Sequence, residues 1–369
     1  MVTPNHTEYQ RAGVDYSVLD RVKRAAIERA AATSVLLGAS GGTEFAGSRG
    51  ATAYVFDIGG LTLALVSEGL GTKSIIAEDY LAQSGESRFA DIAVDGVAAI
   101  VNDVVSVGAN PIVVTAYFAT GDAAWYSDER KSLELLAGWQ RACEVSGATW
   151  GGGESPALPG LLTGAGIELA GSALAVVPPG RRPVFGEDVR PGDCIVVLPS
   201  SGLHTNGASL ARRIAADLPG GYLTALPSGR TFGAALLDPS VLYPPFIRAL
   251  LESSVHPHFL NPITGHGLLK IMRPAAEVRY VLHTLPEVPE VLKFLVGRTE
   301  MSASEAYATL NMGFGYVVIV SAAEAERTVE IARQVGYSGF IAGKVVSGDK
   351  SVSVPSLGIE YYGDELSVS

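Results

Sequence analysis

The sequence predicts an α+β (α/β) protein of two domains, and three observations lead to this prediction. The chain has 369 residues, more than one ordinary hydrophobic core accommodates. Hydrophobic residues make up 47% of it and charged residues 18%, a balance typical of packed globular proteins rather than disordered ones. Segments with the periodicity of strands alternate with segments of helical periodicity in both halves of the chain.

The first half shows this alternation clearly. In chain order, the pattern predicts a helix over 20–32, strands over 54–57 and 61–66, a helix over 91–107, a strand over 112–117, a helix over 133–145 and a strand over 169–177. Gly59 and Gly60 predict a tight hairpin between the first two strands, since glycine accepts the positive φ angles of such turns. The two later helices are expected to end at Gly108 and Gly147.

A proline- and arginine-rich stretch, 178–183, is the best candidate for a domain boundary. We therefore predict an N-terminal domain over 1–178 and a C-terminal domain over 185–369. Within the second, the pattern predicts a strand over 193–198, a helix over 208–216, a loop-rich region over 227–245, and a strand, a helix and a strand over 316–320, 322–335 and 339–345.

Charge and cysteine content exclude several classes of function. The formal net charge of −11 argues against nucleic-acid binding, because backbone phosphates require a basic surface. Cys143 and Cys194 lie too far apart in the sequence to suggest a disulfide framework or a thiolate zinc site. The polar start of the chain does not fit a signal peptide, and no apolar stretch is long enough to span a membrane. We expect a cytoplasmic protein without a membrane or nucleic-acid partner.

The first motif of chemical interest, 67–73, directly follows a predicted strand. Gly69 and Gly71 allow close approach of the backbone to a ligand, and the N–H groups up to Thr72 could form a nest for an anion. Glu68 could hold a metal ion, and Lys73 could neutralise a phosphate. The spacing is not that of G-x-x-x-x-G-K-[ST]. Considered alone, the motif is equally well interpreted as an ordinary glycine turn.

Polar residues on an otherwise apolar helix form a second candidate. Asp95, Asn102 and Asp103 fall near one helical face, where a buried carboxylate needs a partner. Such a face suits a magnesium site completed by Glu68. In isolation, however, a solvated polar stripe is the better interpretation.

Three glycines at 151–153 precede Glu154, which could supply a further oxygen ligand to magnesium. Because consecutive glycines cost backbone entropy on folding, a steric or ligand-contact reason is plausible for them. A flexible turn with a surface carboxylate is about equally plausible.

Three further glycine-bracketed junctions lie in the second half. Residues 200–207 stand between a predicted strand and a helix, where N–H groups and hydroxyls can bind an anion. His204 in this loop could act as an acid, a base or a phosphate ligand, although a lone loop histidine is more often solvated or capping. Residues 261–267 and 309–315 could equally be tight turns.

Taken together and in order, eight segments resemble the aminoimidazole-ribonucleotide synthetase (phosphoribosylformylglycinamidine cyclo-ligase) superfamily. They are 9–15, 68–73, 101–103, 116–121, 152–159, 200–210, 263–268 and 309–315. Each segment is a weak signal, but eight collinear matches over nearly the whole chain are a strong one.

The resemblance implies a homodimer in which strands of the N-terminal domain join those of the partner. It implies ATP and Mg²⁺ in a cleft, with γ-phosphoryl transfer to the formyl amide oxygen of formylglycinamidine ribonucleotide followed by closure of the imidazole ring in purine biosynthesis. The metal ligands would be Glu68, Asp95, Asp103 and Glu154. The ATP contacts would be Glu68, Gly69, Gly71, Thr72, Lys73, Asn102, Asp103 and Glu154. The substrate contacts would be His204, Asn206, Thr264, Gly265 and Asn311, and the catalytic residues Lys73, Asp103 and His204.

The chain departs from the family pattern mainly where the acceptor substrate should bind. Glu68 and Ala116 stand where the family has aspartate, Pro262 replaces a histidine, and His266 replaces a glycine. The family's E-N-I-P-R-like stretch is replaced by 270–274, which begins with lysine.

These departures leave two alternatives open. One is a paralogue that phosphorylates another small acceptor. Selenophosphate synthetase and the hydrogenase-maturation dehydratase are disfavoured because the chain lacks their terminal cysteines, whereas thiamin-monophosphate kinase is harder to exclude. The other alternative is a non-catalytic nucleotide-binding relative.

Overall fold

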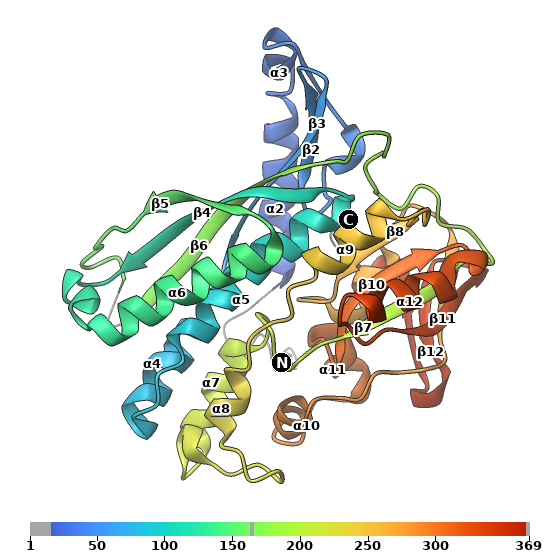
Figure 1. Ribbon diagram of the computed structural model, residues 1–369. Coiled ribbons are helices and arrows are strands. Elements are labelled where there is room, and N and C mark those ends of the chain that lie inside the picture. The colour runs from blue at the N-terminus through green and yellow to red at the C-terminus, as the bar shows by residue number, and fades with distance from the viewer. Residues whose placement is uncertain (1–15, 163–165, 367–369) are drawn as a thin grey trace, which may run out of the picture.

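A computed structural model describes residues 16–162 and 166–366, and it consists of two β-sheets, one built by each half of the chain (Figure 1). Helices pack on each sheet, so the predicted two-domain α/β architecture is confirmed. The family-like segment 9–15 lies outside the described residues. No described helix combines the length and apolar character that crossing a membrane requires.

The first sheet has six strands in the order β1-β2-β3-β6-β4-β5. The strands are β1 (Gly42–Glu44), β2 (Tyr54–Ile58), β3 (Leu61–Gly69), β4 (Asn110–Thr120), β5 (Thr149–Glu154) and β6 (Ile167–Val176). All neighbours are antiparallel except β4 and β5. The predicted hairpin joins β2 to β3, with φ angles of 59° at Gly59 and 80° at Gly60.

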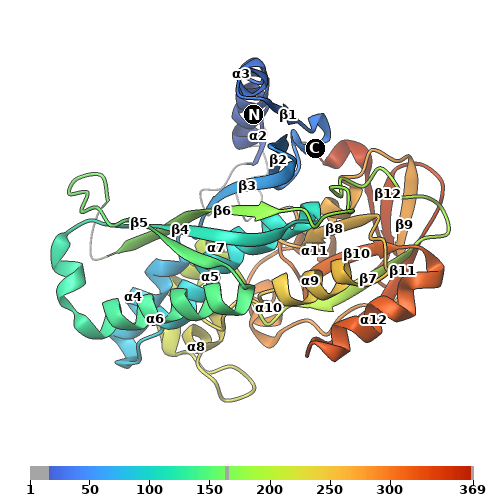
Figure 2. The same ribbon diagram turned by 45° about the horizontal axis from the view of Figure 1, so that its top comes forward.

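Helices cover one face of this sheet and leave the other open (Figure 2). The helices of the first half are α2 (Tyr16–Ala31), α3 (Val35–Ala39), α4 (Lys73–Ser84), α5 (Phe89–Val104) and α6 (Glu129–Ser146). The central one, α5, packs on β3, β6 and α6, and its Ile92, Val97, Ile100 and Val104 form a fully buried stripe. Both views show α3 projecting from the body, and Figure 2 shows β1 beside it.

The second sheet has seven strands in the order β13-β12-β9-β11-β7-β10-β8. The strands are β7 (Cys194–Pro199), β8 (Phe259–Pro262), β9 (Val278–Leu282), β10 (Phe314–Val320), β11 (Phe340–Ser347), β12 (Ser351–Val354) and β13 (Ile359–Tyr362). The helices around it are α7 (Ala208–Asp217), α8 (Phe232–Leu236), α9 (Pro244–Glu252), α10 (Glu290–Val296), α11 (Ala303–Thr309) and α12 (Ala325–Gln334). Helix α12 packs on β7 and β11, as the predicted strand-helix-strand unit requires.

One local expectation is corrected. The glycines at 151–153 belong to β5 instead of forming a turn, and a Cβ on Gly153 would lie 1.9 Å from the carbonyl oxygen of Ala116. Glycine therefore permits the close approach of β5 to β4. After the 261–267 junction the chain forms a 3-10 helix, η5 (Gly267–Met272).

Candidate functional site

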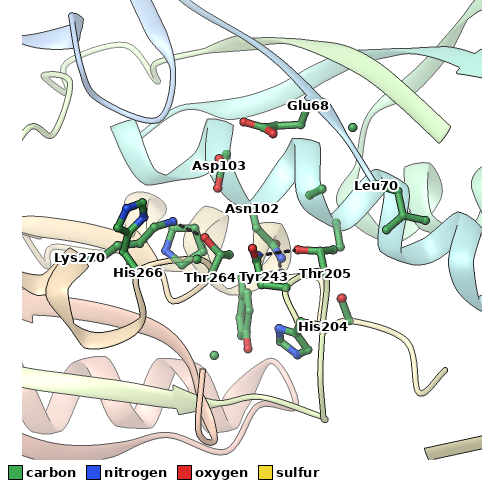
Figure 3. A pocket seen from close by; sticks show the side chains of 18 of the residues that line it. Glu68, Leu70, Asn102, Asp103, His204, Thr205, Tyr243, Thr264, His266 and Lys270 are labelled. Atoms are coloured by element: carbon green, nitrogen blue, oxygen red, sulfur yellow. Dashed lines mark hydrogen bonds between the residues drawn. The ribbon is translucent and has the colours of Figure 1, made fainter. Parts of the chain in front are cut away.

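A cavity of about 370 Å³ lies between the two halves of the chain, where the end of β3 and the last turn of α5 face loops of the second sheet (Figure 3). Its walls include, from the first half, Lys23, Glu68, Gly69, Leu70, Asn102 and Asp103, and from the second half, His204, Thr205, Asn206, Tyr243, Thr264, Gly265, His266, Lys270 and Arg273. Gly315 also lines the cavity, so the structure assembles residues from five of the sequence motifs in one place.

Two carboxylates form the first-half wall of this cavity. Glu68 comes from the end of β3 and Asp103 from the end of α5, and their side chains point toward one another in Figure 3. Loss of water, followed by repulsion from Asp103, raises the pKa of Glu68 to about 7, although Glu68 is exposed to solvent, which screens this effect. Burial also raises the pKa of Asp103. Two carboxylates this close favour a shared cation.

Two cations form part of the opposite wall. Lys270 and Arg273 come from η5 and its end, and Lys270 is only 6% exposed. Burial first, and then the Arg273 guanidinium, lower the pKa of Lys270 to about 7. Neither residue was assigned a role from the sequence, where the one available signal was the departure of 270–274 from the family's E-N-I-P-R-like stretch.

His204 occupies the strand-to-helix junction with a positive φ of 57° and is nearly buried. Its Nε2 accepts hydrogen bonds from the backbone N–H groups of Ser201 (3.1 Å) and Val241 (3.5 Å). Because a backbone N–H can only donate, Nε2 carries no proton and the neutral ring is protonated at Nδ1. Burial first, and then the Lys73 ammonium, lower the pKa of His204 to about 3.

This histidine is expected to make stability depend on pH. The folded pKa lies below the ordinary value, so the unfolded state binds more protons between about pH 6.5 and pH 3. Its contribution is therefore complete above pH 6.5 and is lost on acidification, by up to about 1.4 kcal/mol per pH unit. Urea titrations at several pH values should show a flatter profile in His204→Gln. The exposed His256 provides the control: His256→Gln should keep the wild-type slope, and equal slopes in all three proteins would contradict the prediction.

Asn102 lines the cavity but also joins the two halves. Its Nδ2 donates to the carbonyl of Val241 at 2.9 Å, and its Oδ1 accepts from the N–H of Tyr243 at 2.9 Å. Both ends of the amide are therefore used to position the segment opposite α5. Asn206, in turn, donates to the hydroxyl of Thr205 at 3.3 Å, so the 200–207 loop presents polar groups to the cavity.

The structure places Lys73 and Asp95, predicted for phosphate and metal binding, outside the cavity lining. Both side chains are completely buried and form an ion pair of 2.6 Å with each other. The N–H and hydroxyl of Ser240 donate to the Asp95 carboxylate at 2.9 and 2.5 Å. A buried carboxylate must be paired, and here the partner is Lys73 rather than a metal ion. Neither residue lines the cavity, so phosphate neutralisation by Lys73 is not carried into our proposal.

Glu154 is also separated from the carboxylate pair, by the thickness of the sheet. Glu68 on β3 pairs with Gly171 on β6, and a Cβ on Gly171 would contact α5, so both residues face the helices. Glu154 on β5 pairs with Tyr117 on β4, and Tyr117 pairs with Ala170, the neighbour of Gly171 on β6. Adjacent residues of a strand point to opposite faces, so Glu154 is on the open face. The four predicted metal ligands therefore do not converge. Indeed, within 16–162 and 166–366 no three His, Cys, Asp or Glu side chains form a metal-binding group.

Asn311, predicted to contact substrate, instead braces the 200–203 loop from inside. Its Nδ2 donates to the carbonyls of Gly202 (2.9 Å) and Leu203 (3.1 Å), and its Oδ1 accepts from Ser200 and Gly313. It is 3% exposed and does not line the cavity. Its role is to support the loop that carries His204.

The predicted anion nest is partly engaged within the protein. The N–H of Gly71 donates to Oε1 of Glu168 at 3.1 Å, and the Thr72 hydroxyl lies 3.1 Å from that of Ser209. Gly69, by contrast, lines the cavity. Burial raises the pKa of Glu168, which sequence reasoning missed because nothing around it forms a motif.

His266 has a left-handed backbone with a φ of 67°, a conformation that glycine adopts without strain. It stands where the resembling family has glycine. Along with His204 and Met312, it is one of three non-glycine residues with positive φ in the described chain, and all three lie in the glycine-bracketed junctions. Strained backbone is thus concentrated in the loops around the site.

Comparison with known proteins gives matches over most of the chain. The family model described as AIR synthase related protein, N-terminal domain, matches residues 50–177, and the model of the corresponding C-terminal domain matches residues 190–355. A phosphoribosylformylglycinamidine cyclo-ligase of Methanococcus maripaludis is 32% identical over 340 residues, 91% of either chain. That of Pyrococcus furiosus is 32% identical over 353 residues, 96% of this chain and 99% of the relative.

Solved structures share the fold at lower identity. The hydrogenase maturation protein HypE in complex with ATP has a TM-score of 0.60 and 18% identity, covering 83% of this chain and 85% of that one. ThiL complexed with AMPPCP and TMP has a TM-score of 0.57 and 15% identity, with coverage of 85% and 90%. T. maritima PurL complexed with FGAR has a TM-score of 0.57 and 18% identity, with coverage of 84% and 46%.

Proposed function

The chain belongs to the AIR synthase related family, and from that premise we propose that it is an ATP- and Mg²⁺-dependent cyclo-ligase. The reaction would convert formylglycinamidine ribonucleotide to the aminoimidazole in the cytoplasm. One observation supports this most: a single cavity between the domains presents a carboxylate pair on one wall and a cation pair on another. The names of the relatives and the ATP-bound neighbour support the same activity.

The carboxylate pair fits a magnesium site. Mg²⁺ is usually held by one or two protein carboxylates together with substrate phosphates and water, so Glu68 and Asp103 suffice without Asp95 or Glu154. Loss of water first, and then repulsion from Asp103, raise the pKa of Glu68, and a divalent cation would relieve the repulsion. When bound, Mg²⁺ would neutralise negative charge on the triphosphate.

The other residues of the cavity position reactants. The Nδ1–H of the neutral His204 is a hydrogen-bond donor, so this residue is suited to stabilise a developing negative charge rather than to remove a proton. The Thr264 and Thr205 hydroxyls and the Asn206 amide provide further polar contacts. An amide oxygen leaves poorly until it is phosphorylated, and phosphoryl transfer depends mainly on positioning and charge neutralisation.

We also propose a homodimer formed through the open face of the first sheet. Leu61, Leu65 and Tyr117 are 54%, 43% and 38% exposed and lie on that face, away from α5. Exposed apolar side chains on an uncovered sheet face favour an interface. The side chains of Glu154 and Glu168 would then lie beside the partner subunit.

The activity is tested by incubating the protein with ATP, Mg²⁺ and formylglycinamidine ribonucleotide and measuring ADP and aminoimidazole ribonucleotide. Stoichiometric formation of both is expected. ADP without the imidazole would indicate another acceptor, in line with the fold shared with ThiL. If neither ATP hydrolysis nor acceptor turnover occurs, the chain is a nucleotide-binding relative and the proposal fails.

A further inference from the structure

The charges of the interdomain cavity are segregated between its walls. The carboxylates of Glu68 and Asp103 belong to the first half of the chain, and the cations Lys270 and Arg273 belong to the second. Figure 3 shows Lys270 beside Thr264, on the side of the cavity away from Leu70. The Lys270 ammonium donates to the Thr264 hydroxyl.

Neither cation is neutralised by a direct contact. Arg273 Nη1 donates to the amide oxygen of Asn261 at 3.3 Å, a neutral acceptor like Thr264. No described carboxylate lies within ion-pairing distance of Lys270 or Arg273, although Lys73, the other buried lysine of the interdomain region, has such a partner at 2.6 Å. Asp103 and Glu68 attract both cations from the opposing wall, but burial outweighs this attraction and lowers the pKa of Lys270 and of Arg273. A buried cation without a contacting anion is costly, so these two positions favour binding of an anionic ligand.

The hydrogen-bonding capacity of the pair matches a phosphate monoester. An ammonium carries three donors, of which Thr264 accepts one, and a guanidinium can engage two oxygens of one anion. A phosphate monoester supplies nearly two negative charges and three acceptor oxygens. A neutral sugar hydroxyl would leave both charges unneutralised.

We infer that Lys270 and Arg273 bind the phosphate monoester of the acceptor and thereby select a phosphorylated substrate over the corresponding nucleoside. The inference rests on the proposed function, which assigns Mg²⁺ and the ATP phosphates to Glu68 and Asp103 on the opposing wall. The anion at Lys270 and Arg273 is then a second one, supplied by the acceptor.

Ribose 5-phosphate tests this without ATP, Mg²⁺ or turnover. Its binding is measured by calorimetry in the presence of EDTA for the wild type, Lys270→Met, Lys270→Arg and Arg273→Met. Replacement of either cation by methionine should weaken binding roughly tenfold or more, since hydrogen bonds between charged groups are among the strong ones. Lys270→Arg, which keeps the charge, should retain most of the affinity. Lys293→Met removes an exposed lysine of α10 outside the cavity and should bind as the wild type does.

Two comparisons separate the possible sources of the phosphate. Ribose should bind weakly and equally to all variants. The substitutions should weaken the binding of metal-free ATP less than the binding of ribose 5-phosphate. Equal binding of ribose 5-phosphate by wild type and Lys270→Met overturns the inference, as does a loss confined to ATP.

The outcome is also independent of the proposed reaction. If formylglycinamidine ribonucleotide is not converted while ribose 5-phosphate binding depends on Lys270, the reaction is wrong and the phosphate site stands. If the ribonucleotide is converted and Lys270→Met leaves its KM unchanged, the phosphate site is wrong. Melting curves check folding: Lys270→Met should melt no lower than the wild type without ligand, because it removes an unpaired buried charge.

Discussion

Asp103→Asn is expected to reduce ATP turnover by roughly 10²–10³-fold, a typical effect of removing one group that stabilises transition-state charge. The asparagine keeps the shape of the side chain at the end of α5 but removes the negative charge that faces Glu68. With one carboxylate left, the cavity loses half of its proposed magnesium ligands. ADP release under saturating acceptor measures the effect.

The folded state should survive this change. Asp103 and Glu68 repel each other, and burial raises the pKa of Asp103, so loss of its charge relieves a cost. Asp217→Asn, at the exposed end of α7, is the matched control and should be fully active. A folded Asp103→Asn protein with wild-type turnover would exclude Asp103 from the metal site.

Lys73→Met is expected to lower the free energy of unfolding by about 3–5 kcal/mol, the usual cost of removing one partner of a buried ion pair. The substitution leaves the Asp95 carboxylate charged in a fully buried position, with only Ser240 as a hydrogen-bond donor. Urea denaturation measures the loss. Replacement of the exposed Lys344 by methionine should have little effect and provides the control.

A double substitution separates the structural role of the pair from a catalytic one. Lys73→Met with Asp95→Leu removes both charges, so most of the lost stability should return. If Lys73→Met instead leaves stability unchanged and weakens ATP binding, the lysine contacts phosphate as the sequence suggested, and the ion pair is not its main role.

Much of this protein is determined by local sequence. The 3.6-residue spacing of apolar residues between 91 and 107 identifies α5 and its buried face, and Gly59-Gly60 identifies the hairpin of β2 and β3. The same motifs place Glu68 and Asp103 at the ends of neighbouring elements, and His204 at a strand-to-helix junction. Local periodicity is enough for these because each depends on residues close in the chain.

The choice of partners was decided by the tertiary structure. Asp95 and Asp103 share a helical face, but Asp95 meets Lys73 and Ser240, whereas Asp103 opens into the cavity. The sequence predicts both Glu154 and Glu68 as metal ligands, but the register of the strands places Glu154 on the other face of the sheet. Whether a charged side chain becomes a structural ion pair or a ligand depends on which distant segment packs against it. The sequence therefore determined where charged residues occur along the elements, and long-range packing, through burial and pairing, determined which of them remain available to a ligand.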